Sequence, residues 1–349
     1  MELDARKQKV LCAIIESYIE TGEPVGSRTL AEHFGMSVSS ATLRNEMAAL
    51  SDMGYLEQPH TSAGRVPSHL GFRFYIDRLM NKKPLTEDEK QSIDELFRDA
   101  EPNPSAILEE AGQVLASKTG CAAISTTPTT LGGGTAHIEL VPTGRKLYLL
   151  LFLTSAGVVK HKVCRIEFEV SSEAVSRFVR MINDRIQSVA VEEITPAFIQ
   201  TLAASMGEYA LSFSPIIFAL YELAREACSG ELIVEGQNNL LLYSELVTAA
   251  RDLLGFLSRE DELLNLLSHG SAPLTLGGNS MNVLLGKELK MSELSDIGII
   301  VTRYRFGKDA GGAIGVLGPA RIDYAKIIPY IEYLALGLGR LLNDTFDES

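Results

Sequence analysis

The sequence predicts an α+β protein, because segments with helical periodicity alternate with short β-rich runs. Apolar residues recur mainly at helical spacing over residues 5–80. Runs rich in β-branched residues follow over 122–168, helical spacing returns over 172–228, and short strands separated by turns occupy 274–317. With 349 residues, 46% of them hydrophobic, the chain is long enough for two or three domains with real cores.

The first 80 residues predict three helices, a β-hairpin and a fourth helix. In order, the expected elements are helices over 5–20, 27–34 and 40–53, strands over 55–58 and 65–67, and a helix over 70–80. Ser39 is a good N-cap for the third helix and Gly54 suits its C-terminal stop. This order is typical of a winged helix-turn-helix, in which the second helix of the motif reads base edges in the major groove.

The exposed polar residues of the third helix and of the hairpin tip are the candidate DNA contacts. Arg pairs with guanine and Asn with adenine, so Arg44 and Asn45 could read bases, while Leu43 and Met47 face inward. The hairpin offers small donors to phosphates and one Arg for a minor groove. Any single Arg could instead be a solvated surface charge, but the joint pattern favours DNA binding. The candidate residues are Ser39, Ser40, Thr42, Arg44, Asn45, His60, Thr61, Ser62 and Arg65.

The charge distribution fits contact with phosphate in one place. The net charge is −13, yet residues 1–83 carry ten basic and ten acidic side chains, and the remaining residues carry 22 against 35. Within residues 60–83, Asp77 is the one acidic residue against five basic ones, Arg65, Arg73, Arg78, Lys82 and Lys83. We interpret this as a locally basic strip on an acidic protein that repels DNA elsewhere.

The remaining sequence predicts a mixed domain with a mostly helical insertion. A polar run ending at Pro84 predicts a linker, followed by helices over 85–119 interrupted near Pro102 and Pro104. The runs over 122–168 suggest an antiparallel meander, and Pro196 and Pro215 mark helix starts. A last helix over 324–342, beginning after Asp323, carries an apolar stripe. We interpret the stripe and the apolar helices over 172–228 as core, with part of that surface available for a dimer interface. The stripe comprises Ile327, Ile328, Ile331, Leu334, Leu338 and Leu341.

Several classes of protein are disfavoured by the sequence. Four distant cysteines, Cys12, Cys121, Cys164 and Cys228, form neither a disulfide framework nor a zinc site, and indicate buried thiols in a reduced cytoplasm. No apolar run is long enough for a membrane span, and the first residues do not resemble a signal peptide. The glycine clusters at 131–134 and 311–312 lack phosphate-binding motifs and are expected in hairpin turns. We therefore expect no enzyme activity, no cofactor and no metal.

Three segments resemble the HrcA family of bacterial heat-inducible transcription repressors. The first two are residues 22–30, GEPVGSRTL, and 37–71, SVSSATLRNEMAALSDMGYLEQPHTSAGRVPSHLG. The third, at residues 312–324, is GAIGVLGPARIDY. The resemblance implies a winged helix, a GAF-like mixed α/β domain carrying an inserted dimerisation segment, an inverted-repeat operator upstream of chaperone genes, and modulation by a GroEL-type chaperonin.

These expectations define a domain plan and two functional hypotheses. The plan places the winged-helix domain at 1–81, a linker and connecting helix at 82–104, the GAF-like domain at 105–170 and 231–349, and the inserted dimerisation segment at 171–230. The first hypothesis is a cytoplasmic homodimeric repressor bound to double-stranded DNA. The second is a metabolite-responsive transcription regulator that senses a small ligand through its GAF-like domain, which would require convergent polar residues inside the C-terminal sheet.

Overall fold

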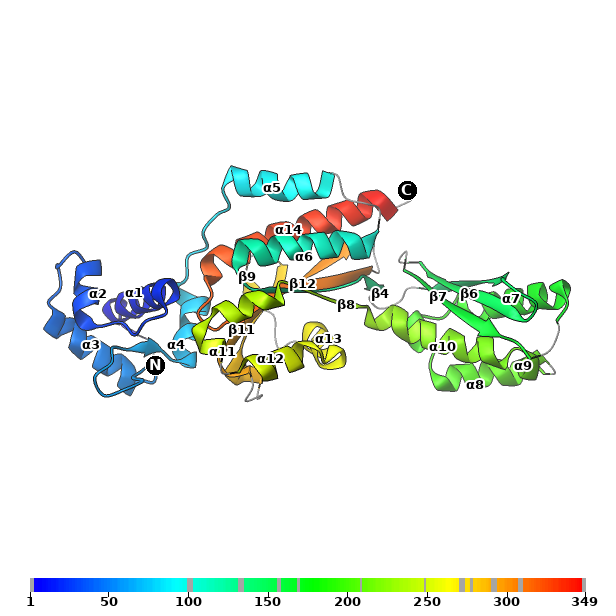
Figure 1. Cartoon of the computed structure of the whole chain (residues 1–349), viewed down its shortest axis with the longest axis horizontal. Helices are drawn as coiled ribbons and strands as arrows, with labels where there is room; N and C mark the ends of the chain where they lie inside the picture. Colours follow the sequence, from blue (N-terminus) through cyan, green and yellow to red (C-terminus); the bar gives the residue numbers. More distant parts are fainter. Residues whose placement is uncertain are drawn as a thin grey trace.

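The chain forms mixed α/β structure drawn out along one axis (Figure 1). The computed structural model describes residues 3–98, 103–130, 135–155, 158–167, 170–207, 209–247, 249–269, 274–276, 279–289, 294–306 and 310–346. Three regions follow one another along the axis (Figure 1). They are an N-terminal unit of helices, a body built on the largest sheet, and a lobe at the far end; we use these names for residues 3–80, the central sheet with its helices, and residues 135–230.

The N-terminal unit contains the expected helices and hairpin. Its elements are α1 (Ala5–Thr21), α2 (Ser27–His33), α3 (Ser40–Asp52), β1 (Leu56–Glu57), β2 (Val66–Pro67) and α4 (His69–Phe74), which continues into a π-helical turn (Tyr75–Leu79). Leu11 of α1, Leu30 of α2 and Leu50 of α3 are fully buried, because each helix turns its apolar stripe toward the others. The secondary structure predicted for this region is confirmed, with shifts of a few residues at the ends.

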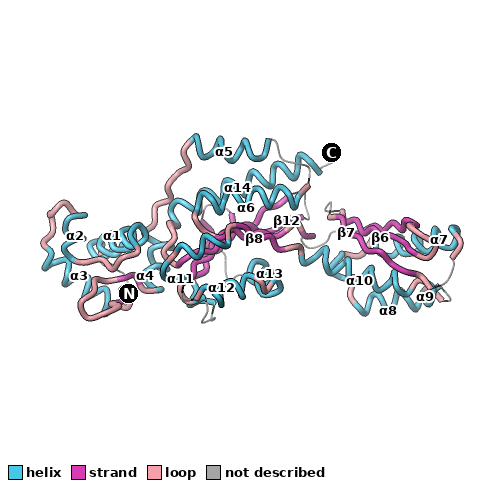
Figure 2. Tube along the Cα trace, in the orientation of Figure 1, coloured by secondary structure: helices cyan, strands magenta, loops and turns pink. Residues whose placement is uncertain are grey.

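The body is a sheet covered on both faces by helices (Figures 1 and 2). Its strands are β3 (Ala122–Thr126), β4 (Thr129–Thr130), β8 (Leu232–Glu235), β9 (Leu274–Leu276), β10 (Asn279–Leu285), β11 (Ile297–Phe306) and β12 (Ala310–Pro319). Among the described residues the order is β8-β3-β12-β11-β10-β9 with β4 beside β12, and every pairing is antiparallel. Successive residues of β11 serve opposite faces, since Ile300 and its neighbours Ile299 and Val301 lie in different cores.

The helices of the body form two layers. On one face lie α6 (Pro104–Thr119) and α14 (Tyr324–Phe346), with α5 (Glu87–Arg98) outside α14 (Figure 1). On the other lie α11 (Ser244–Val247), α12 (Ala250–Leu257) and α13 (Glu260–His269) (Figure 1). Short 3-10 turns occur at Gly286–Leu289, Gln237–Leu242 and, in the lobe, Val191–Glu193.

One apolar core runs from the N-terminal unit into the body. Ile14 of α1 and Ile331 of α14 belong to the same cluster of buried side chains. The stripe of α14 is buried in it, with Leu341 partly buried, so the predicted core role of this helix is confirmed. Asp323 accepts a hydrogen bond from the Lys326 backbone N–H (3.2 Å), as expected of an acid at a helix start.

The lobe has a separate core between a second sheet and four helices. Its strands β5 (Ala136–Pro142), β6 (Leu147–Thr154) and β7 (Val159–Arg165) pair in that order, and its helices are α7 (Ser172–Ile186), α8 (Pro196–Ser205), α9 (Tyr209–Ser212) and α10 (Ser214–Ser229). Phe178 and Phe213 stack at 4.0 Å between ring centroids. The buried Asn183 amide both accepts from Ile138 N–H (2.8 Å) and donates to its carbonyl (3.0 Å), which fixes α7 to the edge of β5.

This arrangement corrects the expected grouping of strands. Residues 105–170 were expected to lie with the C-terminal strands, but β5, β6 and β7 form a sheet of their own that packs against α7 and α10. The reason is visible in β6, whose buried residues Leu150 and Phe152 contact helices from 172–229 rather than the body. Strand periodicity identifies a half-buried strand but does not tell which helices cover it.

The lobe joins the body where β4 ends and β8 begins. Thr127 N–H donates to the Glu231 carbonyl (2.9 Å), and Glu231 N–H donates to the Thr127 hydroxyl (2.8 Å). Gly230 between α10 and β8 has a φ of 68°, a conformation that favours glycine. A Cβ there would also lie 3.0 Å from the Thr127 carbonyl oxygen. The segment that leaves the body after β4 and the segment that returns to it before β8 are thus hydrogen-bonded to each other.

Two further expectations need correction. Gly311 and Gly312 lie within β12, opposite Arg305 and Tyr304 of β11, rather than in a turn, and a Cβ at Gly312 would lie 2.4 Å from the Tyr304 hydroxyl. The other glycine cluster, 131–134, lies outside the described residues. Within the described residues the four cysteines form no disulfide, but Cys12 and Cys228 are only half-buried, whereas Cys121 and Cys164 are buried.

Candidate nucleic-acid interface

Helix α3 presents a polar N-terminal face to solvent because its apolar face is fixed against the unit. Leu43 and Met47 are buried as predicted, while Ser40, Arg44 and Asn45 are exposed. The three exposed residues lie in the first two turns of α3, where a reading helix contacts base edges. The structure therefore brings together the part of the predicted site that has base-reading chemistry.

Two other predicted residues of α3 form its N-cap. The Ser39 hydroxyl accepts from Thr42 N–H (3.1 Å) and lies 2.8 Å from the Thr42 hydroxyl. The cap satisfies one of the backbone donors at the helix start. Ser39 and Thr42 thus have a structural partner in each other, and their hydroxyls are less available for DNA than that of Ser40.

The hairpin of residues 55–67 is held rigidly at its tip. Gln58 Nε2 donates to the carbonyls of Thr61 (3.0 Å) and Ala63 (3.1 Å) across the turn. Of the predicted residues, His60, Thr61 and Ser62 are exposed there, and Arg65 is half-buried at the start of the return strand. The tip therefore presents polar groups to solvent from a turn that the Gln58 side chain stabilises.

The hairpin is also tied to the chain between α1 and α2. Val25 and Arg65 exchange two backbone hydrogen bonds of 2.9 Å in an isolated antiparallel bridge. Gly64 makes this approach possible, because a Cβ there would lie 2.4 Å from the Val25 carbonyl oxygen. The bridge sets the distance between the hairpin and the start of α2.

A cleft of about 330 Å³ lies where α2, α3 and the hairpin meet. Three arginines line it, one from each element: Arg28 from α2, Arg44 from α3 and Arg65 from the hairpin. We call it the arginine cleft; its other lining residues are Gly26, Ser27, Met47, Gln58, Ser62, Ala63 and Gly64. Sequence reasoning missed Ser27, Arg28 and Gln58. The available signal was the polar start of α2 directly after the turn at Pro24, which the sequence prediction treated only as a helix boundary.

Comparisons with known proteins identify the family. A family model described as "HrcA protein C terminal domain" matches residues 105–328. A "Heat-inducible transcription repressor HrcA" from Clostridium botulinum (strain Alaska E43 / Type E3) is 34% identical over 348 residues, covering 99% of each chain. The chain belongs to the HrcA family. A protein of the same name from Carboxydothermus hydrogenoformans is 33% identical over 344 residues, covering 98% of this chain and 99% of the relative.

The HrcA fold is shared with a solved structure as well. A crystal structure described as that of a hypothetical protein at 2.2 Å resolution matches 99% of this chain and all of its own, with a TM-score of 0.58 and 23% identity. As a member of the HrcA family, the chain is a heat-inducible transcription repressor, which confirms the predicted family and repressor function. The named relatives are transcription repressors and not enzymes.

The basic strip of this HrcA chain is mostly occupied by the body, which corrects its interpretation as a phosphate-binding surface. Arg73 pairs with Glu288 through two hydrogen bonds, Lys82 lies 2.6 Å from Glu332, and Lys83 lies 2.8 Å from Asp323. The Arg73 contact joins the N-terminal unit to the body, and the Lys82 and Lys83 contacts hold the segment that follows the unit. Three of the five basic residues are thus paired with the body, and Arg65 is the member of the strip that lines the arginine cleft.

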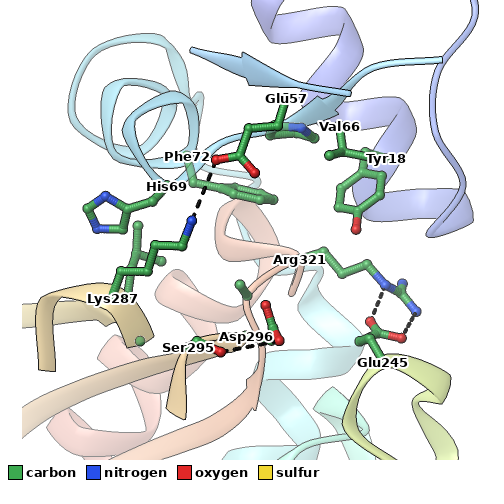
Figure 3. A pocket seen from close by; sticks show the side chains of 14 residues that line it. Tyr18, Glu57, Val66, His69, Phe72, Glu245, Lys287, Ser295, Asp296 and Arg321 are labelled. Carbon is green, nitrogen blue, oxygen red and sulfur yellow. Dashed lines mark hydrogen bonds and ion pairs between the residues drawn. The ribbon is translucent and has the colours of Figure 1, made fainter. Parts of the chain in front are cut away.

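A second, smaller cavity of about 160 Å³ lies at this junction (Figure 3). Glu57 of the hairpin faces Lys287 at 3.5 Å, and on the opposite side Arg321 forms a 2.5 Å ion pair with Glu245. Arg321 also donates to the Ile19 carbonyl at the end of α1 (3.4 Å). The cavity is therefore bounded by polar contacts that join α1 and the hairpin to the body.

The described residues carry no signal for a metal or a membrane. Nowhere in these ranges are three or more His, Cys, Asp or Glu side chains grouped to hold a metal ion. Of the helices described, none combines the length and apolar character needed to cross a bilayer. Burial raises the pKa of the Cys121 thiol to about 11 and that of the Cys12 thiol to about 12.

Proposed function

We propose that this chain binds an inverted-repeat operator in double-stranded DNA as a homodimer and so represses chaperone genes. In this proposal the N-terminal unit acts as a winged helix-turn-helix, with α3 in the major groove and the hairpin as the wing. The observation that carries it is the solvent-facing start of α3, with Ser40, Arg44 and Asn45, beside the arginine cleft. Because the apolar stripe of α3 is buried, the polar face of the helix stays directed toward solvent.

The proposed division of labour follows from chemistry. An Asn amide can both donate to and accept from adenine, so Asn45 suits base reading. The exposed tip residues His60, Thr61 and Ser62 suit phosphate or sugar contacts, which fix register without reading sequence. The acidic excess beyond residue 83 disfavours contact of DNA with the rest of the chain.

Footprinting on the genome's own promoters tests the proposal. The full-length protein is incubated with DNA from upstream of the chaperone genes, with a scrambled duplex of equal length as the control. We expect protection of an inverted repeat with the two halves on one face of the duplex, because a two-fold dimer places two reading helices one or more helical turns apart. Equal protection of both duplexes, or none, would rule out an operator-binding repressor.

The lobe offers the surface that supports a dimer. The face of its sheet away from the buried residues Leu150 and Phe152 carries aliphatic side chains on all three strands, with four polar residues among them, His137, Glu139, His161 and Arg165. The aliphatic residues are Val141, Leu147, Leu149, Leu151, Leu153, Val159 and Val163. Helices α8 and α10 lie on the other side (Figure 1). Val163 is 59% and Val159 57% exposed, and such a patch is typical of an interface. We therefore propose that a second copy covers this face, and that the lobe is the inserted dimerisation segment of a GAF-like body.

Modulation by a GroEL-type chaperonin is part of the proposal. Chaperonin capture needs exposed apolar side chains, and the lobe and body provide Leu211 at 82%, Phe218 at 66% and Leu242 at 80% exposure. We expect operator binding by the purified protein to rise when the chaperonin is added without any small molecule. If the chaperonin leaves the bound fraction unchanged while one metabolite shifts it tenfold, ligand sensing replaces this mechanism.

A further inference from the structure

The arginine cleft concentrates positive charge without a protein counter-charge. Arg28, Arg44 and Arg65 come from three different elements and line one space of about 330 Å³. Among the described residues no ion pair involves any of these three guanidinium groups, although acids pair with Arg6, Lys7, Arg73 and others of the same unit. Like charges brought together repel, so this arrangement is stabilised when an anion enters.

Arg65 carries the sharpest sign of a missing partner. Its Nε is buried and has no hydrogen-bond partner in the described part of the chain. A buried donor without an acceptor is unfavourable, and a guanidinium has five donors that suit the oxygens of a phosphate. The neighbouring Ser27 and Ser62 hydroxyls and the Gln58 side chain add neutral polar groups to the same lining.

The shape of the site distinguishes a phosphate from a base edge. Base edges lie on the floor of a groove and are reached by side chains that project from a convex helix face. The arginine cleft is concave and lies between α2, α3 and the hairpin, so a compact group that protrudes from the duplex fits it. Backbone phosphates protrude in this way and receive most contacts that position a protein on DNA.

We propose that the arginine cleft binds a single phosphate of the DNA backbone, held jointly by Arg28, Arg44 and Arg65. This inference rests on the proposed DNA-binding function and deepens it. It gives Arg44 a backbone contact in place of the guanine contact that its residue type allows, and it leaves base reading to Asn45. It also assigns Arg28 to the interface. One phosphate then ties the helix pair to the hairpin and fixes the register of α3.

The salt dependence of DNA binding measures how many backbone phosphates the protein neutralises. The full-length protein is titrated with a random-sequence duplex at several KCl concentrations, because the contact is independent of sequence. Each neutralised phosphate contributes about 0.9 to the slope of log affinity against log salt. We compare wild type with Arg28→Gln, Arg44→Gln, Arg65→Gln and the triple variant. Arg251→Gln, an exposed arginine of α12 in the body, is the control.

A shared phosphate has a distinctive result. Each single variant should bind about tenfold more weakly at low salt, as loss of a charged hydrogen bond does, and the triple variant should lower the slope by about one unit. A loss of about two units or more would mean separate phosphates, and an unchanged slope would mean that the cleft never touches DNA; either overturns the inference. Wild-type protein that fails to bind any duplex instead contradicts the proposed function itself.

Two further measurements secure the test. Arg65→Lys keeps the charge, so it should retain the wild-type slope, and a melting temperature for each variant shows whether the hairpin still folds. Competition with free pyrophosphate tests whether the cleft instead binds a soluble anion. If pyrophosphate displaces the duplex no better than KCl of equal ionic strength, the DNA backbone is the source of the phosphate. If it displaces the duplex far better, and does so only when the three arginines are present, the cleft is a site for a free anion and the inference fails.

Discussion

At the residue scale, neighbouring side chains of the same type have different roles. Ser39 and Ser40 are both exposed, yet Ser39 accepts the Thr42 N–H as the N-cap of α3 and Ser40 has no such bond. Exposure therefore does not separate a structural serine from one available to DNA. The backbone position does, because the residue directly before the first helical turn faces the orphan donors.

Replacing Ser39 should destabilise α3 itself. Ser39→Ala removes the acceptor of the cap, and we expect a loss of about 1 kcal/mol in the local stability of the helix start. Ser40→Ala, one residue later, is the matched control and should change it little. Hydrogen exchange of the α3 amides measures both, and equal protection in the two variants would contradict the assigned cap.

Replacing Asn45 should affect sequence preference. Asn45→Ala should weaken binding to the operator by about 1–3 kcal/mol and leave binding to random DNA unchanged, because a bidentate base contact is lost. Asp52→Ala, exposed at the C-terminal end of α3, serves as the control. Competition titrations with both duplexes give the ratio of operator affinity to random-DNA affinity. An equal loss of affinity on random DNA would mean that Asn45 contacts the DNA backbone rather than a base.

The sequence predicted which side chains of this site face solvent, but not which distant residues pair with its basic side chains. Periodicity placed Leu43 and Met47 inward and Arg44 and Asn45 outward, since both follow from the position along one helix. It did not show that Arg73 contacts Glu288, which lies 215 positions away. Local charge density thus overestimated the phosphate-binding surface, because an ion pair with a distant element is not visible in a local window.

At the element scale, the position of the hairpin depends on one glycine. A Cβ at Gly64 would collide with the Val25 carbonyl, which is backbone and cannot move aside as a side-chain tip could. Gly64→Ala should therefore separate the hairpin from the start of α2. We expect a lower melting temperature, by a few degrees per kcal/mol lost, and weaker binding to every duplex.

Gly26→Ala is the control for this prediction. It lies in the same connection, has an ordinary φ of −88°, and its Cβ would meet nothing closer than 3.8 Å. Melting curves of the two variants should differ clearly. If both lose the same stability, crowding at residue 64 is not the cause.

The elements themselves were largely predictable, but which helices cover each sheet was not. Pro196 and Pro215 lie in the first turns of α8 and α10 as expected, because proline suits the first turn of a helix. The strand over 146–154 was also predicted, and it pairs with its sequence neighbours as a meander does, yet this sheet was assigned to the domain of the C-terminal strands. Burial on one face is recorded in the local sequence, whereas the identity of the covering helices is a long-range property.

At the scale of the whole molecule, polar contacts at the junction hold the N-terminal unit on the body. Arg73 donates to both Glu288 and the Val283 carbonyl (2.8 Å), and both charged side chains are largely shielded from solvent. A double-mutant cycle with Arg73→Ala and Glu288→Ala should give a coupling of about 1 kcal/mol, at the upper end for partly exposed pairs. The exposed pair Glu87–Lys90 is the control, with a coupling near zero. Equal couplings would show that the junction does not depend on this contact.

The assembly can be tested on the open face of the lobe. Val163→Glu places a charge where a second copy is proposed to pack, so sedimentation should show monomers at concentrations where the wild type is dimeric. Leu336→Glu on α14 is the matched control, at 49% exposure against 59% for Val163, and should leave the mass unchanged. A dimeric Val163→Glu protein would exclude this face as the interface.

Because the molecule is elongated, the hydrogen bonds between Thr127 and Glu231 affect how far its two ends can move relative to each other. The proposed point of association lies toward one end of the long axis, and α3, the proposed reading helix, lies toward the other (Figure 1). The connection at Gly230 lies between them, so in the proposed dimer each protomer would act as a lever about this connection. The displacement at the end of a lever is its length multiplied by the angle of rotation. A slight rotation there would carry two reading helices out of step with the helical repeat of DNA, even if every contact within the N-terminal unit stayed intact.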